Sequence, residues 1–256
     1  MTVHPILTTL EVAGVQVPIG GYGALLALAL AAGAVVALHS AHRAGLELGA
    51  FIAALAAAVG SGFFGAGVLF AAVEWLTTRT LPAAPGVVFY GGAITGALGF
   101  AWLARAHGLP LAAALDALLP ALPIGHAIGR LGCYLGGCCY GAAWSGPWAV
   151  TYLHPLAPAA HPSLPRHPWP LYEAAVLIAL AIVFARKWEL RPGHASAWYV
   201  LLYATARFAL EPLRGDSVRG IGWAGQSTSQ LISILLAVGA SAVLAAPRLC
   251  AKQLRV

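Results

Sequence analysis

The segment ARFALEPLRGD, residues 206–216, carries charged side chains at the spacing of one helix face: Arg207, Glu211 and Arg214. Side chains three and four residues apart lie on the same side of an α-helix. Such a charged stripe at the end of an apolar segment is costly in a membrane unless it faces protein or water. It fits either a salt bridge that joins two helices or an anion site in which guanidinium groups grip a phosphate. We favour the anion site.

A further arginine, Arg130, lies in the glycine-rich stretch HAIGRLGCYLGGCCYG, residues 126–141. No acidic residue is near Arg130 in the sequence, so we expect an anionic ligand such as a phosphate to neutralise its charge. If Arg130 and Arg214 share one anion, their guanidinium groups should converge. The glycines form two G-x-x-x-G pairs, which are typical of closely packed helices.

Three of the four cysteines, Cys133, Cys138 and Cys139, follow the spacing C-x4-C-C. This is not the C-x-x-C of thioredoxin-like redox motifs. Together with His126 they make a candidate zinc site, although adjacent cysteines rarely both reach one tetrahedral ion. The alternatives are packed core thiols, a disulfide on an oxidising face, or a nucleophilic thiolate next to Arg130. We favour a structural role and expect no metal.

The segment RHPWPLYEA, residues 166–174, leads from a proline-rich stretch into an apolar one. Pro170 suits the start of a helix. Trp169 and Tyr172 would then serve as interfacial anchors in an aromatic belt, or Glu173 is buried next to an arginine. Both interpretations remain open.

The elements that must position these residues are predicted to be membrane-spanning helices. Charged residues make up only 9% of the 256-residue chain and apolar residues 60%, whereas an ordinary soluble domain has about 25% charged residues. This excludes a disordered chain, a coiled coil, a collagen and a soluble nucleic-acid-binding protein. A span needs about 20 mainly apolar residues. The predicted fold class is an all-α, polytopic membrane protein with about seven transmembrane helices. The seven candidate spans are roughly 19–38, 50–74, 87–106, 110–128, 170–186, 196–213 and 228–246.

The basic residues predict how the chain is oriented. With the N-terminus outside, eight Lys and Arg residues fall in inside loops and four in outside loops, which favours an N-out/C-in arrangement. The longest loop, about 142–169, is then outside, and its prolines favour an ordered lid or short arm over the outer face. No separate soluble domain is visible, so residues 1–256 are predicted to form a single transmembrane domain. The inside residues are Arg43, Arg105, Arg186, Lys187, Arg191, Arg248, Lys252 and Arg255, and the outside residues are Arg79, Arg166, Arg214 and Arg219.

Several motifs in this order resemble the prolipoprotein diacylglyceryl transferase family. They are Tyr22-Gly23, FYGG at 89–92, GRLG at 129–132, RHPxxLYE at 166–173, the R-x-x-x-E-x-x-R from Arg207 to Arg214, and QLISI at 230–234. The resemblance implies a multi-pass enzyme of the bacterial cytoplasmic (inner) membrane with its active site toward the outer face. It would move a diacylglyceryl group from phosphatidylglycerol to the thiol of a lipobox cysteine in a prolipoprotein, releasing glycerol phosphate. The implied partners are phosphatidylglycerol, the lipobox peptide and membrane lipids, with no cofactor and no nucleic acid.

The resemblance also implies roles for individual residues. The expected catalytic residues are Arg130, Arg214, Glu211 and Tyr90. The residues expected to bind the lipid and its phosphate are Tyr22, Arg130, Arg207, Arg214, His167 and Glu173.

The chain departs from the usual family motifs at four positions. The family usually has a histidine where Tyr90 stands, an asparagine at Cys133, an acid at Cys138 and an arginine at Phe63. A tyrosine is a poor general base at neutral pH unless its pKa is strongly lowered. The alternative is therefore a divergent paralogue that acts as a thiol-redox, metal-binding or lipid-binding membrane protein through Cys133, Cys138 and Cys139.

Overall fold

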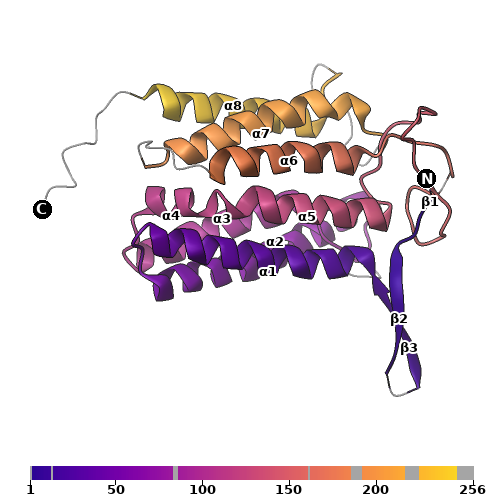
Figure 1. Ribbon diagram of the computed structural model, residues 1–256, viewed down its shortest axis with the longest axis horizontal. Coiled ribbons are helices and arrows are strands. Elements are labelled where there is room, and N and C mark those ends of the chain that lie inside the picture. The colour runs from indigo at the N-terminus through magenta and orange to yellow at the C-terminus, as the bar shows by residue number, and fades with distance from the viewer. Residues whose placement is uncertain are drawn as a thin grey trace, which may run out of the picture. The chain divides into compact units, whose positions relative to one another are not determined.

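The computed structural model describes residues 2–12, 14–82, 86–160, 162–185, 192–216 and 225–246. Helices dominate this part of the chain (Figure 1). The helices are α1 (Gly21–Arg43), α2 (Leu48–Thr78), α3 (Phe89–Ala106), α4 (Leu111–Leu118), α5 (Ala121–Gly136), α6 (Trp169–Ala185), α7 (His194–Leu210), the 3-10 turn η1 (Glu211–Leu213) and α8 (Thr228–Ala245). The strands are β1 (Thr2–Val3), β2 (Ile6–Val12), β3 (Val15–Gly20) and β4 (Thr151–Tyr152).

Among the described residues, four helical stretches are long and apolar enough to cross a membrane, and α6 is a shorter apolar helix. The prediction of a mainly α-helical membrane protein is confirmed, whereas the number of seven spans and the N-out/C-in orientation stay predictions. The four stretches are Gly21–Arg43, Leu48–Thr78, Leu111–Gly136 and Thr228–Ala245. Of the basic residues that predict the orientation, Arg186, Lys187, Arg191, Arg219, Arg248, Lys252 and Arg255 lie outside the described residues.

The fourth predicted span is broken. Helix α4 ends at Leu118 and α5 begins at Ala121, with Pro120 between them. Proline has no N–H to donate to the preceding turn, which accounts for the interruption. Helix α5 then continues through much of the glycine-rich stretch, until Gly137 takes a left-handed conformation at φ 68° and ends it.

The chain forms two compact units, one made of Met1–Val35 with Leu119–Val256 and the other of Val36–Leu118. In the first unit, α5, α6, α7 and α8 lie side by side (Figure 1). Helix α1 meets α5 at glycines: a Cβ at Gly132 or at Gly136 would lie 3.4 Å from atoms of Tyr22. This contact confirms the close packing predicted from the Gly132–Gly136 pair.

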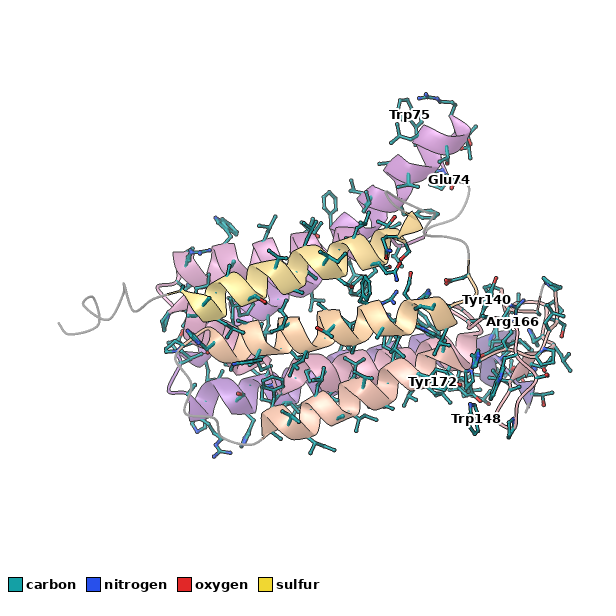
Figure 2. All side chains as sticks on the ribbon, turned by 90° about the horizontal axis from the view of Figure 1, so that it is seen from above. Glu74, Trp75, Tyr140, Trp148, Arg166 and Tyr172 are labelled. Carbon is teal, nitrogen blue, oxygen red and sulfur yellow. The ribbon has the colours of Figure 1, made fainter. Side chains whose placement is uncertain are left out.

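The segment between α5 and α6, residues 137–168, contains turns, isolated β-bridges and the short strand β4, and is called the cap below. Figure 2 shows Tyr140, Trp148 and Arg166 of this cap at the same end of the unit as Tyr172 in the first turn of α6. The guanidinium carbon of Arg166 lies 4.4 Å from the ring centroid of Tyr140. The side of the membrane on which the cap lies stays a prediction.

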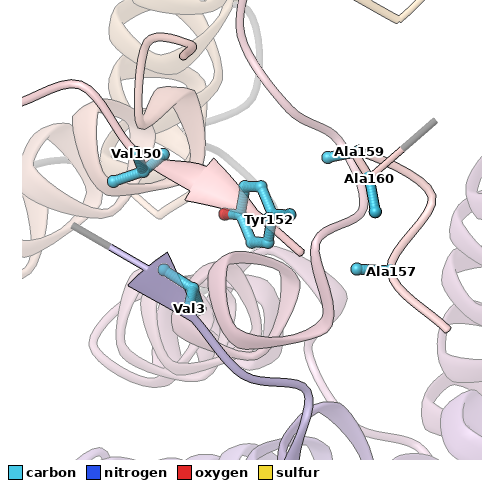
Figure 3. Packing of buried hydrophobic residues seen from close by; sticks show 6 residues of the cluster. All are labelled: Val3, Val150, Tyr152, Ala157, Ala159 and Ala160. Carbon is cyan, nitrogen blue, oxygen red and sulfur yellow. The ribbon is translucent and has the colours of Figure 1, made fainter. Parts of the chain in front are cut away.

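A small core holds the cap together (Figure 3). Strand β1 pairs in parallel with β4, with Val3 opposite Tyr152. The hydroxyl of Tyr152 donates a hydrogen bond of 2.8 Å to the backbone oxygen of Tyr134, at the end of α5. The N-terminal strand is therefore tied to the cap and the cap to the helix. The core residues are Val3, Val150, Tyr152, Ala157, Ala159 and Ala160.

Strands β2 and β3 form an antiparallel hairpin, which was not among the predicted elements. Gly14, at φ 80°, lies in its turn, between the paired residues Val12 and Val15. The hairpin extends away from the helix ends of its unit (Figure 1).

The second unit is built around the pair α2 and α3, which approach each other through small residues. A Cβ at Gly91 would lie only 2.4 Å from the backbone oxygen of Gly65. The hydroxyl of Ser61 donates to the backbone oxygen of Thr95 at 2.9 Å, and the hydroxyl of Thr95 donates to that of Ser61 at 2.7 Å. Close packing and polar contacts of this kind join helices in membranes.

Candidate active site

The buried indole of Trp169 gathers three arginines from different parts of the chain. Trp169 begins α6 and is fully buried. The guanidinium carbons of Arg130, Arg207 and Arg214 lie 5.5, 4.9 and 4.3 Å from its ring centroid, which are cation–π distances. Its Nε1–H donates a hydrogen bond of 2.8 Å to the backbone oxygen of Leu210, at the end of α7. The interpretation of Trp169 as an interfacial anchor is therefore wrong.

Arg130 is neutralised inside the protein. Its Nε lies 2.8 Å from Oε2 of Glu173 on α6, and the two side chains are 13% and 1% exposed. The expectation that only a ligand neutralises Arg130 is wrong, because the acid comes from a distant part of the sequence. Glu173 is the buried acid next to an arginine that one interpretation of its motif required.

Arg207 and Glu211, which the spacing predicts to share a helix face, pair with 2.5 Å between Nη1 and Oε2. Arg214, however, does not continue the same helical stripe. Helix α7 ends before Glu211, and Arg214 has an extended backbone at φ −81° and ψ 143°. There its Nε and Nη2 donate to the two carboxylate oxygens of Asp216, at 2.7 and 2.5 Å. Burial raises the pKa of the Asp216 carboxyl, although hydrogen bonding to Arg214 opposes this shift.

Tyr203 and His126 complete the surroundings of Glu173. The hydroxyl of Tyr203 donates to Oε1 of Glu173 at 2.5 Å. Nε2 of His126 lies 3.8 Å from the same oxygen and accepts a hydrogen bond of 3.2 Å from Nε of Arg130. Tyr203 was not among the predicted site residues. A signal was present, because Tyr203 lies four residues before Arg207 and so shares its helix face.

This arrangement suits the binding of an anion. Each guanidinium group has a carboxylate partner, so an anion would be held by the N–H donors that these pairs leave over and not by net positive charge. The polar contacts found for Arg130 in the described structure run through Nε, which leaves its terminal nitrogens as donors for phosphate oxygens. Arg130 and Arg214 converge on one ring, as expected of two arginines that share an anion; the sharing itself stays a prediction.

Two predicted tyrosines belong to different units. Tyr22 is in the first turn of α1, 40% exposed, and contacts Gly132. Tyr90 is in the first turn of α3, in the second unit, where its ring packs edge-to-face on that of Phe89 at 5.8 Å. Phe63, in α2 of the same unit, is 49% exposed.

His167 lies in an aromatic stack in the cap. Its ring is parallel to that of Trp144, with 4.4 Å between the ring centroids. Its Nδ1 lies 3.1 Å from the hydroxyl oxygen of Tyr172, which also accepts a hydrogen bond of 2.9 Å from Nε1 of Trp148. The contacts found for His167 are thus aromatic, and its expected role toward the lipid stays a prediction.

The three clustered cysteines lie together and are free thiols. Their sulfur atoms are within 4.8 Å of one another, and the group does not include His126, the fourth ligand considered from the sequence. Hydrogen bonds from the thiols of Cys133 and Cys138, with the charges of Arg214 and Arg130, hold the pKa of the Cys139 thiol below its ordinary value. Of the structural alternatives, the structure has packed thiols rather than a disulfide.

An apolar groove of about 320 Å³ lies between α5 and α6. Its walls are aliphatic. Two of the lining residues, Ile128 and Leu131, flank Arg130 in the sequence of α5. The other lining residues are Ile124, Ala127, Ile178, Ala181, Ile182 and Ala185.

Comparison with known proteins gives consistent results. The family model described as prolipoprotein diacylglyceryl transferase matches residues 9–246. Phosphatidylglycerol--prolipoprotein diacylglyceryl transferase 2 of Clostridium perfringens is 29% identical over 228 residues, which are 85% of this chain and 87% of the relative. The transferase of Clostridium tetani is 30% identical over 224 residues, 84% of this chain and 87% of the relative. That of Gloeobacter violaceus is 37% identical over 149 residues, 56% of this chain and 54% of the relative.

Proposed function

The chain belongs to the prolipoprotein diacylglyceryl transferase family, and on this premise we propose that it moves a diacylglyceryl group from phosphatidylglycerol to a prolipoprotein. The acceptor is the thiol of the lipobox cysteine. The thioether forms as the carbon–oxygen bond to the phosphate breaks, and glycerol phosphate leaves.

The observation that carries this proposal is the convergence of Arg130, Arg207 and Arg214 on Trp169. Phosphatidylglycerol presents a phosphodiester, and the leaving group gains negative charge as the carbon–oxygen bond breaks. Arginine forks suit phosphate oxygens, and fixed donors next to a developing charge stabilise a transition state. These three arginines therefore hold the phosphate, with Arg130 and Arg214 nearest the reaction.

The acids position the arginines. Glu173 holds Arg130, and Glu211 holds Arg207 while it accepts a hydrogen bond of 2.6 Å from the hydroxyl of Ser227. A guanidinium fixed in this way loses less side-chain entropy when a phosphate binds. Tyr22 and His167, both in the first unit, line the headgroup site in this proposal.

The apolar groove between α5 and α6 supports a lipid donor. An acyl chain in this groove would lie along Ile128 and Leu131, on the turns that flank Arg130. The phosphate and one chain of the same lipid would then be bound by neighbouring turns of one helix.

The membrane arrangement belongs to the same proposal. We infer a single transmembrane domain with about seven spans in the bacterial cytoplasmic (inner) membrane, N-terminus outside and C-terminus inside. The cap at about 142–169 and the arginine site would face outward. The distribution of Lys and Arg supports this orientation. Reporter fusions at residues 160 and 256 test it, and the opposite locations would overturn the outward-facing site.

A transferase assay tests the chemistry. The full chain in detergent is given phosphatidylglycerol and a lipobox peptide, and the mass of the peptide and the release of glycerol phosphate are measured. A peptide with serine in place of the lipobox cysteine is the control. Absence of a diacylglyceryl adduct in the presence of folded protein would overturn the proposal.

Arg214→Lys tests the phosphate site. Lysine keeps the charge but cannot make the two-pronged contact that a guanidinium group makes with a phosphate. We expect the KM for phosphatidylglycerol to rise about tenfold, the equivalent of one charge-assisted hydrogen bond. Arg105→Lys, at the exposed end of α3, is the matched control and should leave the KM unchanged.

A further inference from the structure

Cys133, Cys138 and Cys139 bring three sulfur atoms together where α5 ends, all within 4.8 Å of one another. Adjacent cysteines normally point to different sides of the chain, so their convergence requires an unusual backbone. Gly137 and Cys139 provide it, at φ 68° and 55°. A left-handed conformation is strained for a residue with a side chain, and such strain gathers at functional sites.

We propose that this thiol triad, Cys133, Cys138 and Cys139, binds Zn²⁺ and leaves a fourth coordination position for the thiol of the acceptor peptide. Zinc bound by sulfur at about 2.3 Å in a tetrahedron separates neighbouring sulfurs by about 3.8 Å, so the observed limit of 4.8 Å requires a contraction of about 1 Å at most. A disulfide would use two of the sulfurs and give no reason to bring in the third.

The position of the triad in the fold and the charge of bound thiolates both favour a dication. A zinc ion leaves one negative charge in place of three. The triad also lies at the carbonyl end of α5, where the helix dipole favours a cation.

The number of protein ligands indicates a site that accepts substrate. Among the residues whose positions the structure describes, no fourth cysteine, histidine or carboxylate joins the triad. Zinc sites with three protein ligands keep the fourth position for water or substrate. Cys133 is buried, whereas Cys138 and Cys139 are partly exposed. The open position therefore lies on the side of Cys138 and Cys139, where an incoming thiol would arrive.

The role of the fourth position rests on the proposed function. When the acceptor sulfur binds zinc, its thiol proton is released to water. The thiolate then forms a bond to the glyceryl carbon, and the electron pair of the broken carbon–oxygen bond stays on the phosphate. The leaving glycerol phosphate takes up one proton, and nothing is oxidised or reduced. This step requires no general base at Tyr90.

Metal content is the first test. The full chain is purified in detergent, supplied with Zn²⁺, desalted and analysed by elemental mass spectrometry. We expect about one zinc per chain, lost in Cys133→Ser and Cys138→Ser. Cys250→Ser removes the remaining cysteine of the sequence and should keep the zinc. Equal zinc in all variants, or an intact mass that shows a disulfide among the three thiols in protein taken directly from membranes, would overturn the proposal.

Cobalt spectroscopy tests the open position and does not depend on turnover. Co²⁺ in the site should give sulfur-to-metal charge-transfer absorption, which grows with the number of Co–S bonds. A lipobox peptide should increase this absorption, and the serine peptide should not. No increase with the cysteine peptide would overturn the acceptor role. Because variants can fail to fold, their helicity is measured alongside.

The transfer assay separates the two proposals. If the wild-type chain binds zinc and peptide thiol but transfers nothing, the proposed function fails and the zinc site stands. If transfer occurs and keeps its full rate after zinc is removed by a chelator, the zinc inference fails and the proposed function stands. If transfer is lost when zinc is removed and returns when Zn²⁺ is restored, both proposals are supported.

Discussion

The α2–α3 pair and the cluster around Trp169 are two ways of joining apolar helices. In the α2–α3 pair, glycines let the backbones touch, and Ser61 and Thr95 exchange hydrogen bonds with each other's carbonyl oxygens. Around Trp169, by contrast, arginines and carboxylates of α5, α6 and the end of α7 pair with one another. The first contact contains no ionised group, and the second is built from them.

The two regions differ in what their side chains offer to a ligand. Small residues join two helices without desolvating any charged group, so stability alone does not require buried ion pairs. Ion pairs lose much of their Coulombic gain to desolvation, and apolar replacements are often as stable. The proposed ligand binding therefore gives the Trp169 cluster a role that stability alone does not require. The following substitutions test that difference, in order of expected effect.

Arg130→Gln should have the largest effect, because it leaves the carboxylate of Glu173 buried without its cation. Breaking one side of a buried pair costs about 3–5 kcal/mol. We expect this loss in the free energy of unfolding, measured by SDS titration in mixed micelles, together with loss of transfer. The double variant Arg130→Gln/Glu173→Gln should recover much of the stability but none of the transfer. Arg105→Gln, which removes an exposed charge, should change the free energy by less than about 0.5 kcal/mol.

Gly91→Ala tests the close contact of the α2–α3 pair. Its new methyl group would lie 2.4 Å from the backbone oxygen of Gly65, so the two helices must separate. Overpacking of this kind costs about 1–3 kcal/mol. Gly67→Ala, on α2 with open space around its Cβ position, is the matched control and should not destabilise. Equal stability of the two variants would contradict the close contact of α2 and α3.

Trp169→Phe should have a smaller effect on stability. Phenylalanine keeps an aromatic face for the arginines but loses the hydrogen bond to Leu210, worth about 0.5–1.5 kcal/mol, and it attracts cations less strongly than tryptophan. We expect a reduced free energy of unfolding and a higher KM for phosphatidylglycerol. Trp148→Phe also removes an indole donor but at a residue 60% exposed. The KM should not change there, and an equal change in both variants would contradict the role of Trp169.

The parts of the fold and site that depend on short spacing could be predicted from the sequence. The four-residue spacing of Arg207 and Glu211 predicted a shared helix face, on which the two side chains pair, and the glycines at 132 and 136 predicted a helix contact. Arg214 was placed on a helix that stops before it, although Pro212 marks where an α-helix cannot continue. The hairpin was missed despite Gly14 between two segments rich in β-branched residues.

Long-range pairing could not be predicted. Nothing local to Arg130 indicates that Glu173 will pair with it, because that pair depends on how α5 packs on α6. Trp169 looked like a membrane anchor because a tryptophan next to prolines at the start of an apolar segment is common at interfaces. Trp169 is buried because arginines of α5, of α7 and of the segment that follows α7 pack around its ring.

Ser61→Ala should have the smallest effect on the free energy of unfolding, and it tests the polar contact between α2 and α3. It removes the hydroxyl whose single proton is shared between the backbone oxygens of Thr95 and Ala57, at 2.9 and 2.6 Å. Polar contacts between helices in a membrane contribute about 0.6 kcal/mol on average, far less than the loss expected at Arg130. Thr77→Ala, on the same helix, removes a hydroxyl that bonds only within α2, so its change should be smaller still. Transfer should remain at the wild-type rate in both variants, because α2 and α3 are held by packing. A loss of transfer in Ser61→Ala without a matching loss of stability would give the α2–α3 contact a part in the chemistry and erase the distinction between the two regions.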